Sequence, residues 1–193
     1  MLFRVKKFSE KLLLPLGTKL SKIPANYISI FGFISAILVF IGFSFKWILL
    51  NIIFLCFIFL LDQLDGVIAR LQGVTKFGGF LDSTLDRYSD ILIFVGIILG
   101  EYTEIIIGFI VIFGAFLTSY TRAKIEALGI VSLSGVGLLE RTDRIPILII
   151  GTIIQIWIPF AIWWTMVILA IGTHLTAIQR FIFAYKNLSH KSE

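Results

Sequence analysis

Five aspartates in one short apolar stretch are the residues of this chain best suited to chemistry: Asp62, Asp65, Asp82, Asp86 and Asp90. Asp62 and Asp65 are three residues apart, and Asp82, Asp86 and Asp90 are four residues apart. On two helices, the members of each set therefore share one face. Carboxylates crowded in poorly hydrated surroundings repel one another unless a cation is present. Hard divalent cations prefer oxygen ligands, and Mg²⁺ is often held by a few carboxylates plus substrate phosphates. The spacing therefore predicts a site for two divalent cations, Mg²⁺ or Mn²⁺, as in an in-line phosphoryl displacement.

Small residues beside these carboxylates indicate the size of the ligand. Gly66 follows Asp65, and Ala69 comes one helical turn later, so this helix face is nearly bare and open to a flat group such as a nucleotide base. Gly78 and Gly79 begin the next predicted helix, where free backbone N–H groups and the helix dipole favour an anion. Together these residues predict a bulky phosphorylated ligand.

The elements that position these residues are transmembrane helices. The chain of 193 residues is 58% hydrophobic and 15% charged, and its mean hydropathy is +0.99, which predicts an all-α integral membrane protein. A membrane-spanning helix needs roughly 20 apolar residues, and about six segments qualify: 26–45, 47–69, 80–100, 104–125, 142–158 and 163–185. We expect a transmembrane domain at 23–187, an N-terminal arm at 1–22, a tail at 188–193 and no separate soluble domain.

The N-terminal arm has the pattern of an amphipathic helix lying on the membrane surface. Its apolar run is broken by Pro15 and lacks a small-residue cleavage site, so it is not a cleavable signal. A frayed basic tail is the alternative interpretation. In the helical interpretation, four apolar residues contact lipid and three lysines contact anionic headgroups: Phe3, Val5, Phe8 and Leu12, with Lys6, Lys7 and Lys11.

The basic residues predict the orientation in the membrane, because they concentrate on the cytoplasmic side. Of the seventeen Lys and Arg residues, Lys46 is the one that we assign to an outer loop. All four tryptophans (Trp47, Trp157, Trp163, Trp164) fall at predicted outer ends, where an aromatic belt forms. Both termini and the aspartate site are therefore expected on the cytoplasmic side of the cell membrane. The net charge of +5 is explained by headgroups and anionic substrates, without nucleic acid.

The aspartates and small residues are similar to the signature of the CDP-alcohol phosphotransferases, a family of integral membrane enzymes. The matching residues are Asp62, Asp65-Gly66, Ala69-Arg70, then seven residues, Gly78, Asp82 and Asp86. Eight fixed residues in 25 positions make this a specific match. The family often has a Pro-Asn pair before its first span, whereas this chain has Pro24-Ala25-Asn26, so Asn26 is either part of the site or an ordinary helix cap.

The resemblance implies a reaction and assigns roles to the residues. An alcohol hydroxyl attacks the lipid-linked phosphorus of a CDP-lipid and CMP is released; two cations and a basic carboxylate suit this chemistry. Asp90 lies outside the signature and is read as a structural or supporting acid. Asp62, Asp65 and Asp82 are implied as metal ligands, Asp86 as metal ligand and general base, and Asp65, Gly66, Ala69, Arg70 and Gly78 as the nucleotide-binding residues.

Basic residues on three other predicted spans indicate the second substrate. Arg122, Arg141 and Arg180 could converge on a phosphate of the acceptor, since the planar guanidinium matches phosphate oxygens; Lys124 is a further candidate. The alternative is that these residues only meet lipid headgroups and set topology. The stretches "FLDSTLDRYSD" and "ERTDR" and the pair Gln179-Arg180 resemble one branch of the family, the phosphatidylinositol and archaetidylinositol phosphate synthases. That branch implies inositol 1-phosphate as the acceptor and equivalent basic residues as its phosphate ligands.

Several alternatives remain at this point. Glycerol 3-phosphate also carries a phosphate, whereas serine would leave a phosphate pocket without use. An ion-coupled transporter would explain intramembrane carboxylates, but it predicts paired broken helices and a midplane site, and no internal repeat is apparent. The lipid tails, of CDP-diacylglycerol or of CDP-archaeol, present the same apolar surface. A homodimer is implied by the resemblance alone.

Overall fold

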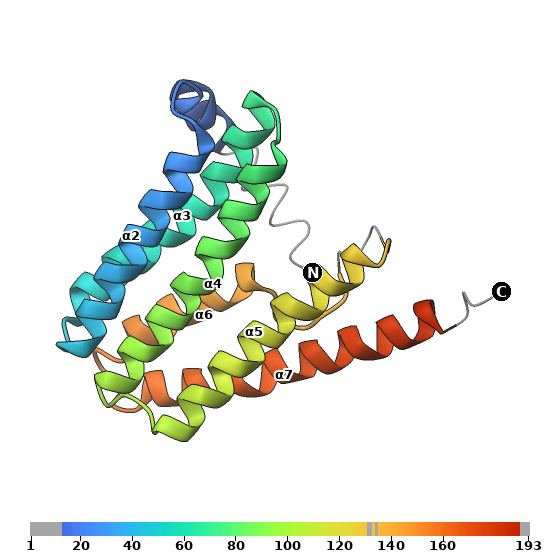
Figure 1. The fold of residues 1–193 in the computed structure, drawn as a ribbon. Coiled ribbons are helices and arrows are strands. Elements are labelled where there is room, and N and C mark those ends of the chain that lie inside the picture. The colour runs from blue at the N-terminus through green and yellow to red at the C-terminus, as the bar shows by residue number, and fades with distance from the viewer. Residues whose placement is uncertain (1–12, 131–132, 134, 190–193) are drawn as a thin grey trace. The chain divides into compact units, whose positions relative to one another are not determined.

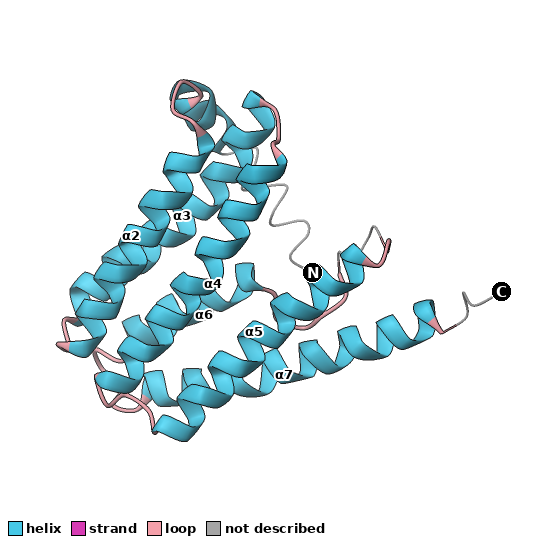
Figure 2. Cartoon of the chain, in the orientation of Figure 1, coloured by secondary structure: helices cyan, strands magenta, loops and turns pink. Residues whose placement is uncertain are grey.

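The computed structural model describes residues 13–130, 133 and 135–189 (Figure 1). All regular elements in this part of the chain are helices (Figure 2), which confirms the all-α prediction. The predicted lipid-facing and lysine residues of the arm lie outside the described residues, although 13–20 is helical. The main helices are α2 (Ala25–Ser44), α3 (Ile48–Gln72), α4 (Lys76–Leu99), α5 (Ile105–Ala127), α6 (Arg141–Ile154) and α7 (Ala161–Leu188).

The chain folds as two compact units, Met1–Gly100 and Glu101–Glu193, and each is described by itself. In the first, the N-terminal unit, α2 packs against both α3 and α4. The helices α2 and α4 approach closely at Gly96, where an added Cβ would lie 2.8 Å from the carbonyl oxygen of Phe40. Small residues permit such contacts between membrane helices, where packing replaces the hydrophobic effect as the driving force.

In the second, the C-terminal unit, α7 packs against both α5 and α6. Polar groups join α5 to α7 within this apolar packing. The Thr118 hydroxyl donates to the Thr173 carbonyl oxygen at 3.0 Å, and the His174 Nε2 atom lies 3.0 Å from the Ile110 carbonyl oxygen. Interhelical hydrogen bonds of this kind contribute modestly to helix association in membranes.

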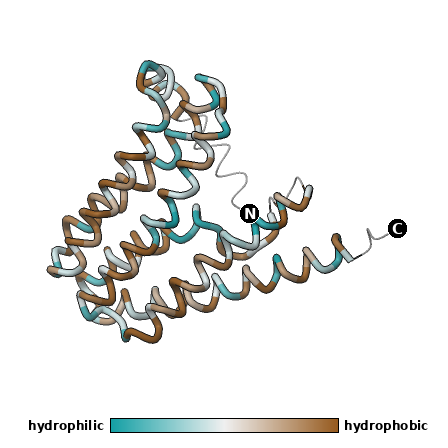
Figure 3. The backbone as a smooth tube through the Cα atoms, viewed as in Figure 1, coloured by the Kyte–Doolittle hydropathy of each residue, from teal (hydrophilic) through white to brown (hydrophobic). Residues whose placement is uncertain are grey.

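Four of the described helices are long and apolar enough to cross a membrane: α2, α3, α5 and α7. Hydrophobic residues cover most of α2 and α3 in Figure 3. The protein is therefore an all-helical membrane protein. The predicted spans 80–100 and 142–158 correspond to α4 and α6, which do not meet the same standard. The first half of α4 carries charged residues, and α6 has 14 residues with Pro146 inside it.

Candidate active site

The connection between α3 and α4 brings the two sets of aspartates together. Helix α3 ends at Gln72, and Gly73 has a positive φ of 95°, a conformation that glycine adopts without strain. Thr75 caps α4, because its hydroxyl accepts a hydrogen bond from the Gly78 N–H at 3.0 Å. A link of only three residues joins α3 to α4, and α2 packs against both helices.

Three carboxylates of these helices form a compact cluster. Asp62, Asp82 and Asp86 are half-buried, and one oxygen of each lies within 4.8 Å of the others. Oxygen atoms at this spacing can converge on one hard cation, so the donor set fits Mg²⁺ or Mn²⁺. Three of the four predicted ligands therefore gather as the helical spacing predicts.

Asp65, the fourth predicted ligand, lies beside this cluster. It is 8% exposed, and its Oδ2 atom accepts a hydrogen bond from the Ser29 hydroxyl of α2 at 3.2 Å. The charges of Asp62, Asp82 and Asp86 all act on it. Such a concentration of negative charge is stable beside cations, which supports the use of all four carboxylates around a pair of ions.

A cavity of about 460 Å³ opens beside the aspartates within the N-terminal unit. Its volume is in the range of small-molecule binding sites. All five residues predicted to bind the nucleotide line it, together with Asn26, Ser29 and Gln72. The five are Asp65, Gly66, Ala69, Arg70 and Gly78.

Gly78 determines the width of this cavity near α2. A Cβ added at Gly78 would lie 2.9 Å from the Thr75 hydroxyl and 3.1 Å from the Asn26 Oδ1 atom. A larger residue would therefore push Thr75, the cap of α4, or Asn26, which lines the cavity. Asn26 is thus part of the cavity wall; the N-cap position of α2 is Pro24.

Ser29 is a residue that the sequence interpretation missed. The hydrogen bond partners of metal-binding carboxylates orient them, and their loss commonly lowers metal affinity 10- to 100-fold. Ser29→Ala is expected to weaken Mn²⁺ binding about tenfold, measured by calorimetric titration of the purified protein. The matched control is Ser35→Ala, because the Ser35 hydroxyl bonds only within α2, to the Phe31 carbonyl. Equal Mn²⁺ affinity in the two variants would contradict the role of Ser29.

The predicted acceptor-binding residues lie in the C-terminal unit and have different surroundings. Arg122 and Lys124 are exposed on α5, and Arg122 pairs with Glu126 at 2.9 Å. Arg141 is half-buried at the start of α6. Arg180 is only 2% exposed. Burial thus separates Arg180 from the other candidates.

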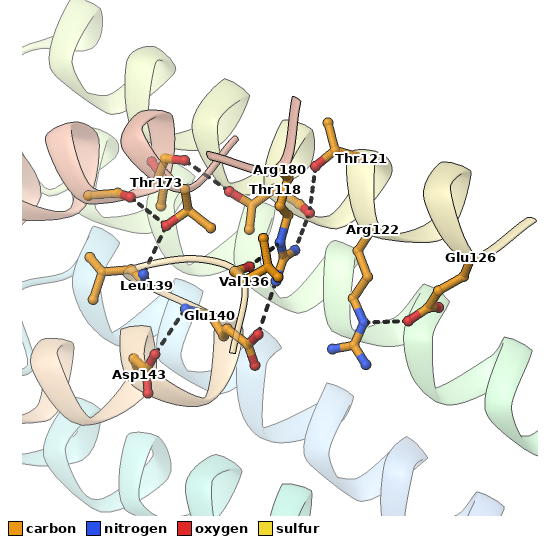
Figure 4. Close-up of polar contacts among 12 residues, drawn as sticks. Thr118, Thr121, Arg122, Glu126, Val136, Leu139, Glu140, Asp143, Thr173 and Arg180 are labelled. Carbon is orange, nitrogen blue, oxygen red and sulfur yellow. Dashed lines mark hydrogen bonds and ion pairs between the residues drawn. The ribbon is translucent and has the colours of Figure 1, made fainter. Parts of the chain in front are cut away.

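The Arg180 guanidinium holds the segment before α6 in position (Figure 4). Its Nε donates to the Val136 carbonyl at 3.0 Å, and its two terminal nitrogens donate to the Thr118 carbonyl at 2.6 Å and to Glu140 at 3.1 Å. Three of its five N–H donors are thus used within the protein. The structure adds an organising role to the predicted phosphate contact of Arg180.

Arg180→Ala is expected to lower the free energy of unfolding by roughly 3 kcal/mol, because it removes one partner of a largely buried ion pair and leaves the Val136 carbonyl without its donor. The Thr118 carbonyl keeps the hydrogen bond from the Thr121 hydroxyl. The measurement is thermal unfolding in detergent. Arg122→Ala is the control, since its ion pair with Glu126 is exposed and such pairs contribute little. Equal unfolding temperatures of the two variants would contradict the organising role.

Positive charge nevertheless accumulates around Arg180. The charges of Arg122 and Arg144 act on it repulsively, and Glu140 attracts it. Arg144 is fully buried; it and Glu140 belong to the stretch "ERTDR", but neither residue was assigned a role in a site from the sequence. Arg144 and Glu140 were missed because their significance depends on contacts between helices.

With this geometry established, the chain can be assigned to a family. The family model described as CDP-alcohol phosphatidyltransferase matches residues 22–128. The matched segment contains the aspartate cluster and the residues that line the cavity. The protein therefore belongs to the CDP-alcohol phosphotransferase family, as the signature predicts.

Curated relatives carry more specific names. The chain is 36% identical over 168 residues to the archaetidylinositol phosphate synthase of Methanothermobacter thermautotrophicus, covering 86% of this chain and 85% of that protein. It is 33% identical over 135 residues to the phosphatidylinositol phosphate synthase of Corynebacterium glutamicum, covering 65% and 61%.

Solved structures of one relative match most of the chain. The phosphatidylinositol phosphate synthase of Mycobacterium tuberculosis with CDP-DAG bound has a TM-score of 0.77 at 25% identity, covering 91% of this chain and 94% of that one. The same enzyme in complex with manganese and citrate has a TM-score of 0.76 at 26% identity, covering 89% and 88%. Because the match to the CDP-DAG-bound enzyme covers 91% of this chain, it includes most residues of both units.

Proposed function

We propose that this protein transfers the phosphatidyl or archaetidyl group of a CDP-lipid to a hydroxyl of inositol 1-phosphate. CMP is the second product. The observation that carries the proposal is the cluster of Asp62, Asp82 and Asp86 beside a cavity lined by the small residues of the signature. The names of the curated relatives, and the CDP-DAG bound to the mycobacterial enzyme, support the same substrates.

The reaction exchanges one phosphorus–oxygen bond for another. The acceptor hydroxyl oxygen forms a bond to the lipid-linked phosphorus, and the bond from that phosphorus to the bridging oxygen of CMP breaks. Asp86 takes the hydroxyl proton as general base. Asp62, Asp65, Asp82 and Asp86 would hold two divalent cations, which supply neutralisation of the diphosphate and of the leaving charge.

The remaining residues of the cavity bind and orient the nucleotide. Gly66 and Ala69 leave room for a flat base against α3, and Gly78 keeps the start of α4 open beside Asn26. Arg70 lines the same cavity and supplies a positive charge for the CDP group. Holding the diphosphate in one geometry lowers the entropic part of the barrier.

The acceptor phosphate is assigned to Arg122, Arg141 and Arg180, with Lys124 as a further ligand. Arginine binds phosphate in a bidentate manner. The positive charge around Arg180 supports an anion site in the C-terminal unit. Glycerol 3-phosphate remains the alternative acceptor because it presents the same phosphate.

The number of membrane spans, their orientation, the domain bounds and the oligomeric state are part of the same proposal. Six spans would include α4, whose 24 residues extend about 36 Å at 1.5 Å per residue, and α6 together with the residues that follow it. Both termini and the aspartates would face the cytoplasm, as the basic residues predict. The proposal also divides the chain into an arm at 1–22, a transmembrane domain at 23–187 and a tail at 188–193. The protein would form a homodimer.

The test is CMP release by the purified protein with Mg²⁺ or Mn²⁺. CDP-diacylglycerol and CDP-archaeol are each combined with inositol 1-phosphate, glycerol 3-phosphate, serine or free inositol. We expect release with inositol 1-phosphate and little with the others. Preference for glycerol 3-phosphate would replace the acceptor, and no release with any alcohol would favour the transporter.

A further inference from the structure

The N-terminal end of α2 forms one wall of the cavity, and a residue of another helix holds it in place. Pro24, Ala25 and Asn26 line the cavity. The N-cap residue Pro24 makes no side-chain cap hydrogen bond, and the first N–H groups of a helix lack partners within it. Another part of the chain must therefore satisfy them.

Gln72, the last residue of α3, provides that partner. Its Oε1 atom accepts a hydrogen bond from the Ala25 N–H at 3.1 Å. Its Nε2 group donates to the Ser21 carbonyl at 2.8 Å and to the Ile23 carbonyl at 2.6 Å. The Gln72 carboxamide thus forms hydrogen bonds with three backbone groups that lie 47 to 51 residues away in the sequence.

The helical stretch 13–20 packs against α3 and so holds the N-terminal side of the segment 21–25. A Cβ added at Gly17 would lie 2.6 Å from the Val67 Cγ1 atom, so the Val67 side chain of α3 packs directly against the backbone at Gly17. Leu13 and Leu20 pack against a buried cluster of Ile28, Leu64 and Ile68. The segment 21–25 is therefore held by apolar packing before it and by Gln72 along it.

We infer that Gln72 is a positioning residue for the nucleotide. By holding Pro24, Ala25 and Asn26 against the end of α3, it keeps one wall of the cavity in its binding arrangement before the ligand arrives. A preformed wall lowers the ordering cost of binding. The inference rests on the proposed function, because it takes the CDP group as the occupant of this cavity.

Two variants of Gln72 separate its hydrogen bonds. Gln72→Met keeps the length of the side chain and removes all three bonds, whereas Gln72→Glu keeps the acceptor for Ala25 and removes both donors. CDP binding in the presence of Mn²⁺ is measured by calorimetry, and KM is measured for the CDP-lipid and for inositol 1-phosphate. We expect Gln72→Met to weaken CDP binding about tenfold and to raise KM for the CDP-lipid by about the same factor. KM for inositol 1-phosphate should stay unchanged. Gln72→Glu should weaken CDP binding at least as much, because its carboxylate oxygen faces the Ser21 and Ile23 carbonyl oxygens and adds a negative charge to the cavity wall.

Gln155 offers a matched control in the other unit. Its Oε1 accepts from the Ile162 N–H at 2.9 Å in the first turn of α7, as the Oε1 of Gln72 does for α2. Gln155→Met should lower thermal stability without changing CDP affinity. Unchanged CDP binding in Gln72→Met would overturn the inference, as would an equal rise in both KM values. If the wild-type protein itself does not bind CDP, the proposed function fails instead.

Discussion

Replacing Asp82 with asparagine is expected to abolish CMP release and Mn²⁺ binding together. Asp82 belongs to the cluster whose oxygens lie within 4.8 Å of one another, and it also lines the cavity. Asparagine preserves the size of the side chain but removes the negative charge that a hard cation needs. Losing several kcal/mol of charge stabilisation should slow turnover on the order of 10³-fold or more.

The control is Glu101→Gln, which removes one negative charge from an exposed position outside the cluster. Turnover and calorimetric Mn²⁺ affinity are measured for both variants. Asp82→Asn should lose both properties, and Glu101→Gln should retain both. Near-normal turnover in Asp82→Asn would remove Asp82 from the metal site, and a loss shared by the control would point to a general effect of charge.

Arg141→Ala should raise KM for inositol 1-phosphate about 10- to 100-fold, the equivalent of roughly 1.5–3 kcal/mol for a hydrogen bond to a charged group. KM for the CDP-lipid should stay unchanged, because Arg141 does not line the nucleotide cavity. Arg180→Ala should shift the same acceptor KM, but its loss of stability complicates the comparison. Arg141, half-buried at the start of α6, is therefore the sharper test.

Lys186→Ala serves as the control for Arg141, since Lys186 is an exposed basic residue in the last turn of α7. It removes the same charge from the same unit without removing a proposed phosphate ligand. Initial rates are measured while each substrate is varied in turn. Equal changes in both KM values for Arg141→Ala would argue against an acceptor pocket, and so would an equal acceptor effect in Lys186→Ala.

The aspartate cluster was predictable because it depends on local spacing. A helix has a fixed periodicity, so Asp82 and Asp86 must share a face, and a short connection brings Asp62 alongside. The sequence did not predict that Asp65 would lie beside the cluster formed by the other three. Its hydrogen bond to Ser29, 36 residues away, depends on how α2 packs against α3.

Among the helices too, some features were predictable from the sequence and others were not. Long apolar runs predicted α2, α3, α5 and α7 directly, because a spanning helix needs little besides length and hydrophobicity. The ends of α6 were not predictable in this way. Pro146 lies inside that helix, and Glu140 and Asp143 form a capping box that begins it at Arg141.

The sequence by itself determined the membrane class, the signature and the candidate metal ligands, since each follows from composition or from residue spacing along α3, α4 and the short link between them. Only the tertiary structure decided that Gln72 caps α2 and that Arg180 binds carbonyls 44 and 62 residues away. The physical reason is that helical periodicity specifies which residues share a face. It does not specify which group on a neighbouring helix that face will meet.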